Sequence, residues 1–219
     1  MTETRRIDFT DVALYAVTPE PTDTTIFLSK VEAVLSGGAD ALQLRAKNLT
    51  DKAFLELGKE VGALCRAAHA LFIIDNRSDL AQVLDADGVH VGHEDVPISI
   101  ARSFVGHRRI VGRSAHSLPE AIEAQKAGAD YVSCGPVWAT PTKPNYPAVG
   151  LGLIGLYHAA LRAPYVVIGG VDEKNIDQVV AAGAKTVAIV RALFDAKDPK
   201  AAAQFFKSKI QKNRQRAAV

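Results

Sequence analysis

The sequence predicts an α/β protein in which eight strand–helix units close into a (β/α)8 barrel, the TIM-barrel fold, as a single domain. Short apolar segments alternate with helix-length amphipathic segments along the 219 residues, an order typical of parallel strands joined by right-handed crossovers. Hydrophobic residues make up 48% of the chain and aromatic residues only 6%, so the core is aliphatic, as in buried parallel sheets. The length suits one barrel, and no shift in composition indicates a second domain.

The predicted strands are short apolar runs that end at glycine, proline or polar residues. The first run, VALYAV, ends at Thr18-Pro19. The sixth, YVSC, ends at Gly135-Pro136, because proline has no N–H for the sheet ladder. The predicted strands are 12–17, 41–44, 71–74, 89–91, 110–112, 131–134, 165–168 and 186–190.

The predicted helices lie between these strands and show apolar positions at helical spacing. Thr50 and Ser117 are predicted N-caps, and Glu120 follows Ser117 by three residues, which makes a capping box. The predicted helices are 24–35, 51–70, 78–84, 98–105, 118–127, 151–161, 173–182 and 199–211. Residues 1–11 are expected to form a polar N-terminal segment, and residues 212–219 a frayed, basic C-terminal tail.

Charge and composition argue against several classes of protein. The net charge of +2 is near balance, whereas nucleic-acid-binding proteins concentrate basic charge. No segment approaches the roughly 18 consecutive apolar residues of a membrane span, and the N-terminus lacks the apolar region of a signal peptide. Cys65 and Cys134 fall in a predicted helix and a predicted strand, which favours two buried thiols over a disulfide. We expect a cytoplasmic protein that binds neither nucleic acid nor membrane.

Polar residues follow most of the predicted strands, at ends that a barrel gathers on one rim. The most informative stretch is ADYVSCGPVWATPTK (129–143), in which a buried strand leads into two hydroxyls and one cation. The rim residues are Gln43, Arg45, Lys47, Asp75, Asn76, Arg77, Asp95, Ser114, Thr140, Thr142, Lys143, Gly169, Gly170 and Arg191. Because barrel active sites lie at this rim, we expect these residues to form one site.

The chemistry of the rim suits two phosphate-bearing groups. One would lie after strands seven and eight, where barrels often bind phosphate. The other would face the cations that follow strands two and six. Asp75 and Asp95 would repel a polyanion unless a divalent cation lay between, and Mg²⁺ commonly takes one or two carboxylates together with phosphate oxygens. The sequence therefore favours a pyrophosphate group bridged by Mg²⁺.

Each of these residues also has an ordinary structural interpretation. Asp75 and Asp95 could be helix caps or first-turn acids, the cations could be solvated loop charges, and the glycine pair could be a tight turn. Their joint occurrence on one rim favours a site. His90, His93 and Glu94 could suggest zinc, but a third clear ligand is lacking and His90 is expected to face the barrel interior, so zinc is disfavoured.

The chain resembles the thiamine-phosphate synthase family in six motifs, which occur in the expected order: LYAVTP, LQLRAK, DGVHVGHED, GRSAH, GADYVSCGPVWATPTK and IGGV. The resemblance covers roughly residues 12–193. IGG alone is weak, whereas QLRxK, GVHxGxED and GPxxxTxTK together are specific. The resemblance implies a (β/α)8 transferase that joins 4-amino-2-methyl-5-hydroxymethylpyrimidine diphosphate to hydroxyethylthiazole phosphate and releases thiamine phosphate and pyrophosphate.

The resemblance also implies roles for the matching residues. The pyrimidine diphosphate would be held by Gln43, Leu44, Arg45, Ala46, Lys47, Asp75, Ser114 and Lys143. The thiazole phosphate would be held by Thr140, Pro141, Thr142, Gly169, Gly170, Val190 and Arg191. Asn76 and Asp95 would bind Mg²⁺, with Asp75 as the alternative ligand. The catalytic residues would be Arg45, Lys47, Ser114 and Lys143, which would stabilise or orient pyrophosphate as it leaves a delocalised carbocation.

Three positions depart from the family pattern. Asp75-Asn76 stands where the family usually has Asn-Asp, so the metal carboxylate is displaced by one residue or its role passes to the amide oxygen of Asn76. His93 replaces a glutamine that usually precedes the Glu-Asp pair. Arg191 replaces a serine, and an arginine there would add a bidentate phosphate contact.

Two other functions fit the same barrel. A thiazole tautomerase-like isomerase would need neither a diphosphate site nor a metal, and the cations of the rim argue against it. A non-catalytic barrel that binds a phosphorylated metabolite fits the displaced metal acid. A nucleic-acid role for residues 207–216 is disfavoured because no aromatic residues are interleaved. The sequence leaves open whether the chain forms a homo-oligomer.

Overall fold

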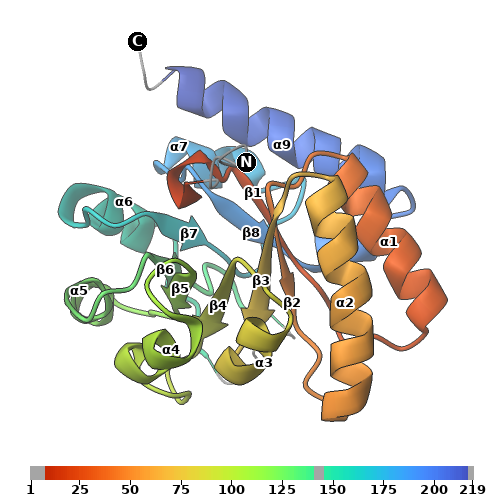
Figure 1. Cartoon of the computed structure of the whole chain (residues 1–219). Coiled ribbons are helices and arrows are strands. Elements are labelled where there is room, and N and C mark those ends of the chain that lie inside the picture. Colours follow the sequence, from red (N-terminus) through yellow and green to blue (C-terminus); the bar gives the residue numbers. More distant parts are fainter. Residues whose placement is uncertain (1–7, 141–145, 217–219) are drawn as a thin grey trace, which may run out of the picture.

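The computed structural model describes residues 8–140 and 146–216. Eight parallel strands close into a barrel in sequence order, with the last strand paired to the first (Figure 1). The strands are β1 (Leu14–Val17), β2 (Ala41–Leu44), β3 (Leu71–Asp75), β4 (Gly88–Val91), β5 (Ile110–Arg113), β6 (Tyr131–Cys134), β7 (Tyr165–Val167) and β8 (Val187–Ile189). The predicted (β/α)8 barrel is confirmed.

Helices surround the barrel, and α1, α2 and α9 lie together on one side of it (Figure 1). The 3₁₀ helix η1 (Phe9–Asp11) precedes β1. The α-helices are α1 (Thr24–Ser36), α2 (Asp51–Ala67), α3 (Ser78–Val83), α4 (Ile98–Val105), α5 (Leu118–Lys126), α6 (Gly152–Ala160), α7 (Ile176–Ala181), α8 (Arg191–Phe194) and α9 (Pro199–Arg216).

Two predicted helix starts have the expected caps. The Thr50 hydroxyl accepts a hydrogen bond from the backbone N–H of Ala53 at 3.4 Å. The Ser117 hydroxyl accepts one from the N–H of Glu120 at 3.4 Å. The Glu120 carboxylate accepts in turn from the N–H of His116 at 2.8 Å, one residue before the cap, so the capping box forms with its return bond shifted by one residue.

The C-terminal region differs most from its prediction. Helix α8 was not predicted, and α9 continues to Arg216, so the predicted frayed tail is wrong for residues 212–216. Arg214 explains the longer helix, because its guanidinium donates to the carbonyls of Lys185 at 2.7 Å and Asp11 at 3.2 Å and also to that of Val12. Burial lowers the pKa of Arg214. This basic residue therefore joins the two ends of the chain.

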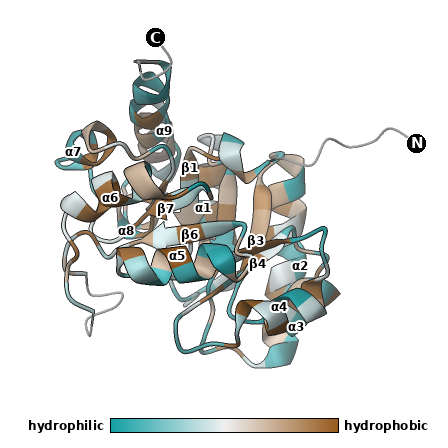
Figure 2. Cartoon of the chain, turned by 90° about the vertical axis from the view of Figure 1, so that its left-hand side faces the viewer, coloured by the Kyte–Doolittle hydropathy of each residue, from teal (hydrophilic) through white to brown (hydrophobic). Residues whose placement is uncertain are grey.

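Side chains of each strand alternate between the helix layer and the barrel interior, as a pleated strand requires. Leu14 packs in the core beneath the helices, whereas the next residue, Tyr15, belongs to a separate core inside the barrel. Figure 2 shows the strands in the brown of hydrophobic residues, while helices carry teal, hydrophilic patches. Only residues with inward-pointing side chains can therefore reach a site inside the barrel.

The amino end of the barrel interior is filled by the N-terminal segment. Phe9 of η1 is only 4% exposed, and its ring stacks on that of Tyr131 with centroids 4.0 Å apart. The predicted polar segment 1–11 thus contains a core residue. Its aromatic ring closes the end of the barrel opposite to the carboxyl ends of the strands.

Three aspartates immediately before even-numbered strands secure the amino ends of the strands. Asp40 accepts from the N–H groups of Ala13 and Leu14 at 2.8 and 2.9 Å. Asp87 and Asp130 bind backbone N–H groups of neighbouring strands in the same way, at 2.8 and 2.7 Å. Because the amino-terminal face of a barrel serves stability rather than catalysis, these acids are structural.

Two further predictions concern the cysteines and membrane segments. Cys65 and Cys134 are both buried and neither forms a disulfide, as predicted. Within residues 8–140 and 146–216, no helix has the length and apolar character needed to cross a membrane.

Candidate active site

A cavity of about 520 Å³ opens among the carboxyl ends of the strands. The predicted site residues that line it are Gln43, Arg45, Lys47, Asp75, Asn76, Asp95, Ser114, Thr140, Gly169, Gly170, Val190 and Arg191. They come from strands or loops spread over the whole barrel, so the predicted convergence on one rim is confirmed for these residues. Pro141, Thr142 and Lys143 lie outside the described residues.

Three predicted residues do not place their side chains in the cavity. Leu44 and Ala46 are buried in the core beneath the helices, because strand alternation turns them away from Gln43 and Arg45. Arg77 does not line the cavity but pairs with Asp51 and Asp79 at 2.7 Å each. Those ion pairs lower the pKa of both carboxyls.

Arg45 is held at the rim by two carboxylates. Its Nη1 lies 3.1 Å from Glu20 Oε1, and its Nε lies 3.9 Å from Asp75 Oδ2. Glu20 also accepts from the N–H of Lys47 at 3.0 Å. The loop after β1 therefore orients the cationic loop after β2, a contact that sequence reasoning did not predict.

An acidic cluster lies beside this cation. Asn76 adopts the left-handed conformation, with φ 64°, which asparagine tolerates better than most residues. In the amide orientation that satisfies its hydrogen bonds, the Asn76 nitrogen donates to Asp95 Oδ2 at 2.8 Å and Asp75 Oδ1 at 3.2 Å. Asp95 Oδ2 also accepts from the N–H of Gly92 at 2.5 Å. The amide thus lies between two carboxylates.

His90 faces the barrel interior, as predicted. Its two ring nitrogens lie 2.9 Å from the Tyr131 hydroxyl and 3.0 Å from Ser114 Oγ. No group of three or more histidine, cysteine, aspartate or glutamate side chains in the described parts of the chain is arranged to hold a metal ion.

The opposite side of the cavity is formed by a glycine pair and a loop. Gly169 and Gly170 have φ values of 101° and 70°, a region that favours glycine. A Cβ on Gly169 would lie 2.4 Å from Pro136, and one on Gly170 would lie 2.7 Å from Trp138. Because glycine has no Cβ, the backbone at these two positions can approach the loop after β6 closely.

Several cavity residues were missed from the sequence. They are Tyr15, Tyr131, His116 and Tyr146. The alternation of side chains along a strand could have indicated the two strand tyrosines. Tyr15 points the same way as Val17, and Tyr131 the same way as Ser133, and both Val17 and Ser133 line the cavity. Desolvation is the main cause that raises the pKa of both strand tyrosines well above the usual value, so both hydroxyls keep their protons. The ring of His116 packs against that of Tyr146 with centroids 4.4 Å apart, a contact between loops that no local pattern indicates.

Comparisons with known proteins agree with this geometry. A thiamine phosphate pyrophosphorylase from Pyrococcus furiosus has the same fold, with a TM-score of 0.83 and 34% identity over 92% of this chain and 96% of that one. A family model described as thiamine monophosphate synthase matches residues 14–193. The chain belongs to this family.

Relatives within the thiamine monophosphate synthase family are similar over most of this chain. The Thermus thermophilus thiamine-phosphate synthase is 42% identical over 89% of this chain and 94% of its own length. The Nostoc enzyme is 43% identical over 90% of this chain, which spans only 55% of that longer protein. The resemblance seen in the six motifs is thereby confirmed. A 3-hexulose-6-phosphate synthase, with 24% identity and a TM-score of 0.67, shares the fold.

Proposed function

We propose that the chain is a thiamine-phosphate synthase. It would join 4-amino-2-methyl-5-hydroxymethylpyrimidine diphosphate to hydroxyethylthiazole phosphate and release pyrophosphate. The observation that carries this proposal is the convergence of Arg45, Lys47, Asp95 and Ser114 on one cavity at the carboxyl ends of the strands. Membership of the family supports the same reaction.

The acidic cluster fits a divalent cation. Mg²⁺ prefers oxygen ligands and commonly takes one or two carboxylates together with substrate phosphate. Asp95 and Asp75 offer carboxylates, and Asn76 offers an amide oxygen once its side chain turns. The amide nitrogen now lies between the carboxylates, where a positive group is favoured. Bound Mg²⁺ would neutralise charge on the leaving pyrophosphate.

Side chains of the protein would stabilise and orient the reacting groups. Arg45, Lys47 and Lys143 would stabilise the charge that grows on pyrophosphate as the CH₂–O bond breaks. The aminopyrimidine delocalises the resulting cation, so no protein nucleophile is required. Ser114 would orient the leaving group, and Gln43 the pyrimidine ring.

The thiazole phosphate would lie on the other side of the cavity. Thr140, Thr142, the backbone of Gly169–Gly170, and Val190–Arg191 would hold its phosphate. An arginine at position 191 gives a bidentate donor. Holding the phosphate there would direct the thiazole nitrogen toward the pyrimidine cation.

A coupling assay tests this proposal. Purified protein receives both substrates, with and without Mg²⁺, and both thiamine phosphate and pyrophosphate are measured. Production of both in a Mg²⁺-dependent manner is expected. A tautomerase would act on the thiazole alone and release no pyrophosphate, and a binding protein would bind substrate without product, so either result would refute the proposal.

The variant Lys143→Ala provides a second test. Loss of this cation should lower turnover of the pyrimidine diphosphate about 100-fold or more. Lys126→Ala is a matched control, because Lys126 ends α5 and does not line the cavity. Near-normal turnover by Lys143→Ala would remove Lys143 from the mechanism.

A further inference from the structure

A continuous chain of hydrogen bonds crosses the barrel interior beneath the cavity. Gln43 Nε2 lies 3.2 Å from the Tyr15 hydroxyl, which lies 2.9 Å from the Tyr131 hydroxyl. Tyr131 contacts His90 Nδ1 at 2.9 Å, and His90 Nε2 contacts Ser114 Oγ at 3.0 Å. Both ends of the chain, Gln43 and Ser114, line the cavity.

The protons in this chain can be ordered from one end. The Gln43 amide nitrogen can only donate, so Tyr15 accepts there and its single hydroxyl hydrogen goes to Tyr131. Tyr131 then gives its own hydrogen to His90 Nδ1. Neutral imidazole carries its remaining hydrogen on Nε2, which donates to Ser114 Oγ. One amide orientation therefore fixes the histidine tautomer.

This order determines what the two ends present to a ligand. Ser114 accepts from His90, so its own hydroxyl hydrogen is left to donate into the cavity. Gln43 uses its nitrogen within the barrel, so its carbonyl oxygen is left to accept from a donor in the cavity. The two ends are thus complementary to a ligand with an anionic oxygen at one point and an amino group at another.

We infer that His90 is a positioning residue, which sets Ser114 as a donor to an oxygen of the substrate diphosphate while Gln43 accepts from the pyrimidine amino group. This inference rests on the proposed function for the identity of the ligand. Its core, the direction of the hydrogen-bond chain, rests only on the contacts within the barrel.

The environment of the chain supports a fixed direction. Tyr15 and Tyr131 are 2% and 0% exposed, so bulk water has little access to their hydroxyls. Burial raises the pKa of both, so each keeps the one hydrogen that the argument assigns to it. Phe9 stacks on Tyr131 at 4.0 Å and holds its ring in place.

Nitrogen-15 NMR on the ligand-free protein tests the direction of the chain. Long-range proton–nitrogen correlations distinguish the two imidazole tautomers, and the signal that disappears in the His90→Gln variant belongs to His90. The expected tautomer carries hydrogen on Nε2. Hydrogen on Nδ1 would mean that the chain runs from Ser114 to Gln43 and would overturn the inference.

A pair of variants tests the consequence for catalysis. Glutamine places an amide nitrogen near the position of Nε2 and can still donate to Ser114, whereas asparagine reaches only the Nδ1 position. His90→Gln should keep kcat/KM for the pyrimidine diphosphate within about threefold of wild type, and His90→Asn should lower it about tenfold or more. KM for the thiazole phosphate should stay within about twofold in both.

Equal losses in the two variants, with equal thermal stability, would refute the positioning role. If neither variant folds, the His90 signal is assigned in the wild-type protein through correlations between its ring and its backbone, and the NMR result still decides the direction. If the wild-type protein releases no pyrophosphate, the proposed function fails, whereas the tautomer result tests the direction of the chain independently.

Discussion

The order of Asp75 and Asn76 determines which group lies between the carboxylates of the acidic cluster. The Asn76 nitrogen lies between Asp95 and Asp75 and binds both, so it does part of what a cation would do there. To accept a metal, the amide must turn and give up these two hydrogen bonds. We therefore expect an amide at position 76 to stabilise the metal-free site and to weaken metal binding.

We predict that Asn76→Asp increases affinity for Mg²⁺ about tenfold, because ligand charge is a main determinant of affinity for hard cations. Calorimetric titration with Mg²⁺ in the absence of substrates measures this directly. The double variant Asp75→Asn, Asn76→Asp is the matched control, since it keeps the total charge of the pair.

The double variant should also keep or increase Mg²⁺-dependent activity. An affinity that falls in the double variant but not in Asn76→Asp would show that Asp75 is the metal ligand in this chain. Complete loss of activity in the double variant would show in addition that Asp75 is indispensable.

For individual residues, the sequence predicted most of the charged and polar side chains that line the rim. Polar residues at strand ends, such as Arg45 and Ser114, were found because barrel geometry alone brings those ends together. The side chains of Leu44 and Ala46 lie outside the cavity, because a motif names consecutive residues whereas an extended backbone turns alternate side chains away. Glu20 was missed because its partner, Arg45, lies 25 residues further along the chain and no periodic pattern links them.

Among the strands, β5 and β6 depend on a glycine at their contact. Gly112 pairs with Tyr131 across the two strands, and a Cβ at position 112 would lie 2.1 Å from the tyrosine ring. The ring cannot move aside, because Phe9 stacks on it at 4.0 Å.

Gly112→Ala should destabilise the protein by about 1–3 kcal/mol through overpacking. Denaturant unfolding measures the change. Gly155→Ala is the control, because this exposed glycine in α6 has nothing within 4 Å of an added Cβ and should gain up to about 1 kcal/mol from helix propensity. Equal stability of the two variants would show that the barrel adjusts to the added methyl.

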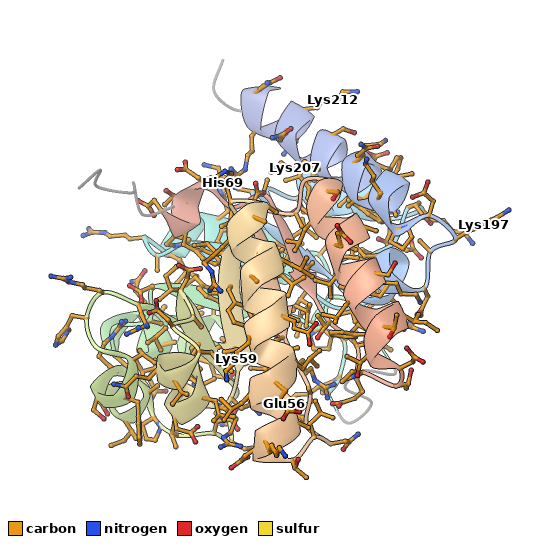
Figure 3. All side chains as sticks on the ribbon, turned by 45° about the vertical axis from the view of Figure 1, so that its right-hand side comes forward. Glu56, Lys59, His69, Lys197, Lys207 and Lys212 are labelled. Carbon is orange, nitrogen blue, oxygen red and sulfur yellow. The ribbon has the colours of Figure 1, made fainter. Side chains whose placement is uncertain are left out.

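Helix α9 attaches to the barrel through polar contacts near its C-terminus. Arg214 reaches backbone carbonyls of Lys185, Asp11 and Val12. Lys212, on the same helix, is exposed (Figure 3). The sequence did not predict this part of the helix because its last turns carry no apolar stripe, and their anchoring depends on hydrogen bonds to distant segments.

Arg214→Ala should lower the free energy of unfolding by about 2–3 kcal/mol, since it leaves carbonyls without their charged donor. Lys212→Ala should change it by less than about 0.5 kcal/mol. Thermal and denaturant unfolding of both variants provide the comparison. A similar, small effect of both would mean that α9 is held by its apolar contacts alone.

The folded barrel buries both cysteines, so the free energy of unfolding depends on pH in the alkaline range. Burial raises the pKa of Cys65 and of Cys134 from the ordinary value of 9.0 to about 12. Above pH 9 the unfolded chain loses the thiol protons while the folded chain keeps them. The unfolded state then binds fewer protons, so the free energy of unfolding falls as pH rises.

We predict a loss of up to about 1.4 kcal/mol per pH unit for each thiol between pH 9 and 12. Denaturant unfolding at a series of pH values measures the slope. The Cys65→Ala, Cys134→Ala variant, although less stable, should show a shallower slope. An unchanged slope would assign the alkaline loss to other groups, such as the buried tyrosines.

Closure of the barrel was the most secure prediction from the sequence, because eight alternations of strand and helix leave few other topologies. The short helix α8 could not be predicted, since its four residues are too few to show a period. Local patterns thus determined the architecture, and contacts between distant loops determined the details of the site.

The ring of Phe9 closes the amino end of the barrel, so the cavity is entered from the carboxyl ends of the strands. This has a kinetic consequence. Both reactants must arrive, and both products depart, through the same opening. Gln43 and Ser114 are only 5% and 4% exposed, so we expect the reactant that they hold to bind before its partner. A cavity with one entrance therefore favours ordered binding, and we expect the pyrimidine diphosphate to bind ahead of the thiazole phosphate.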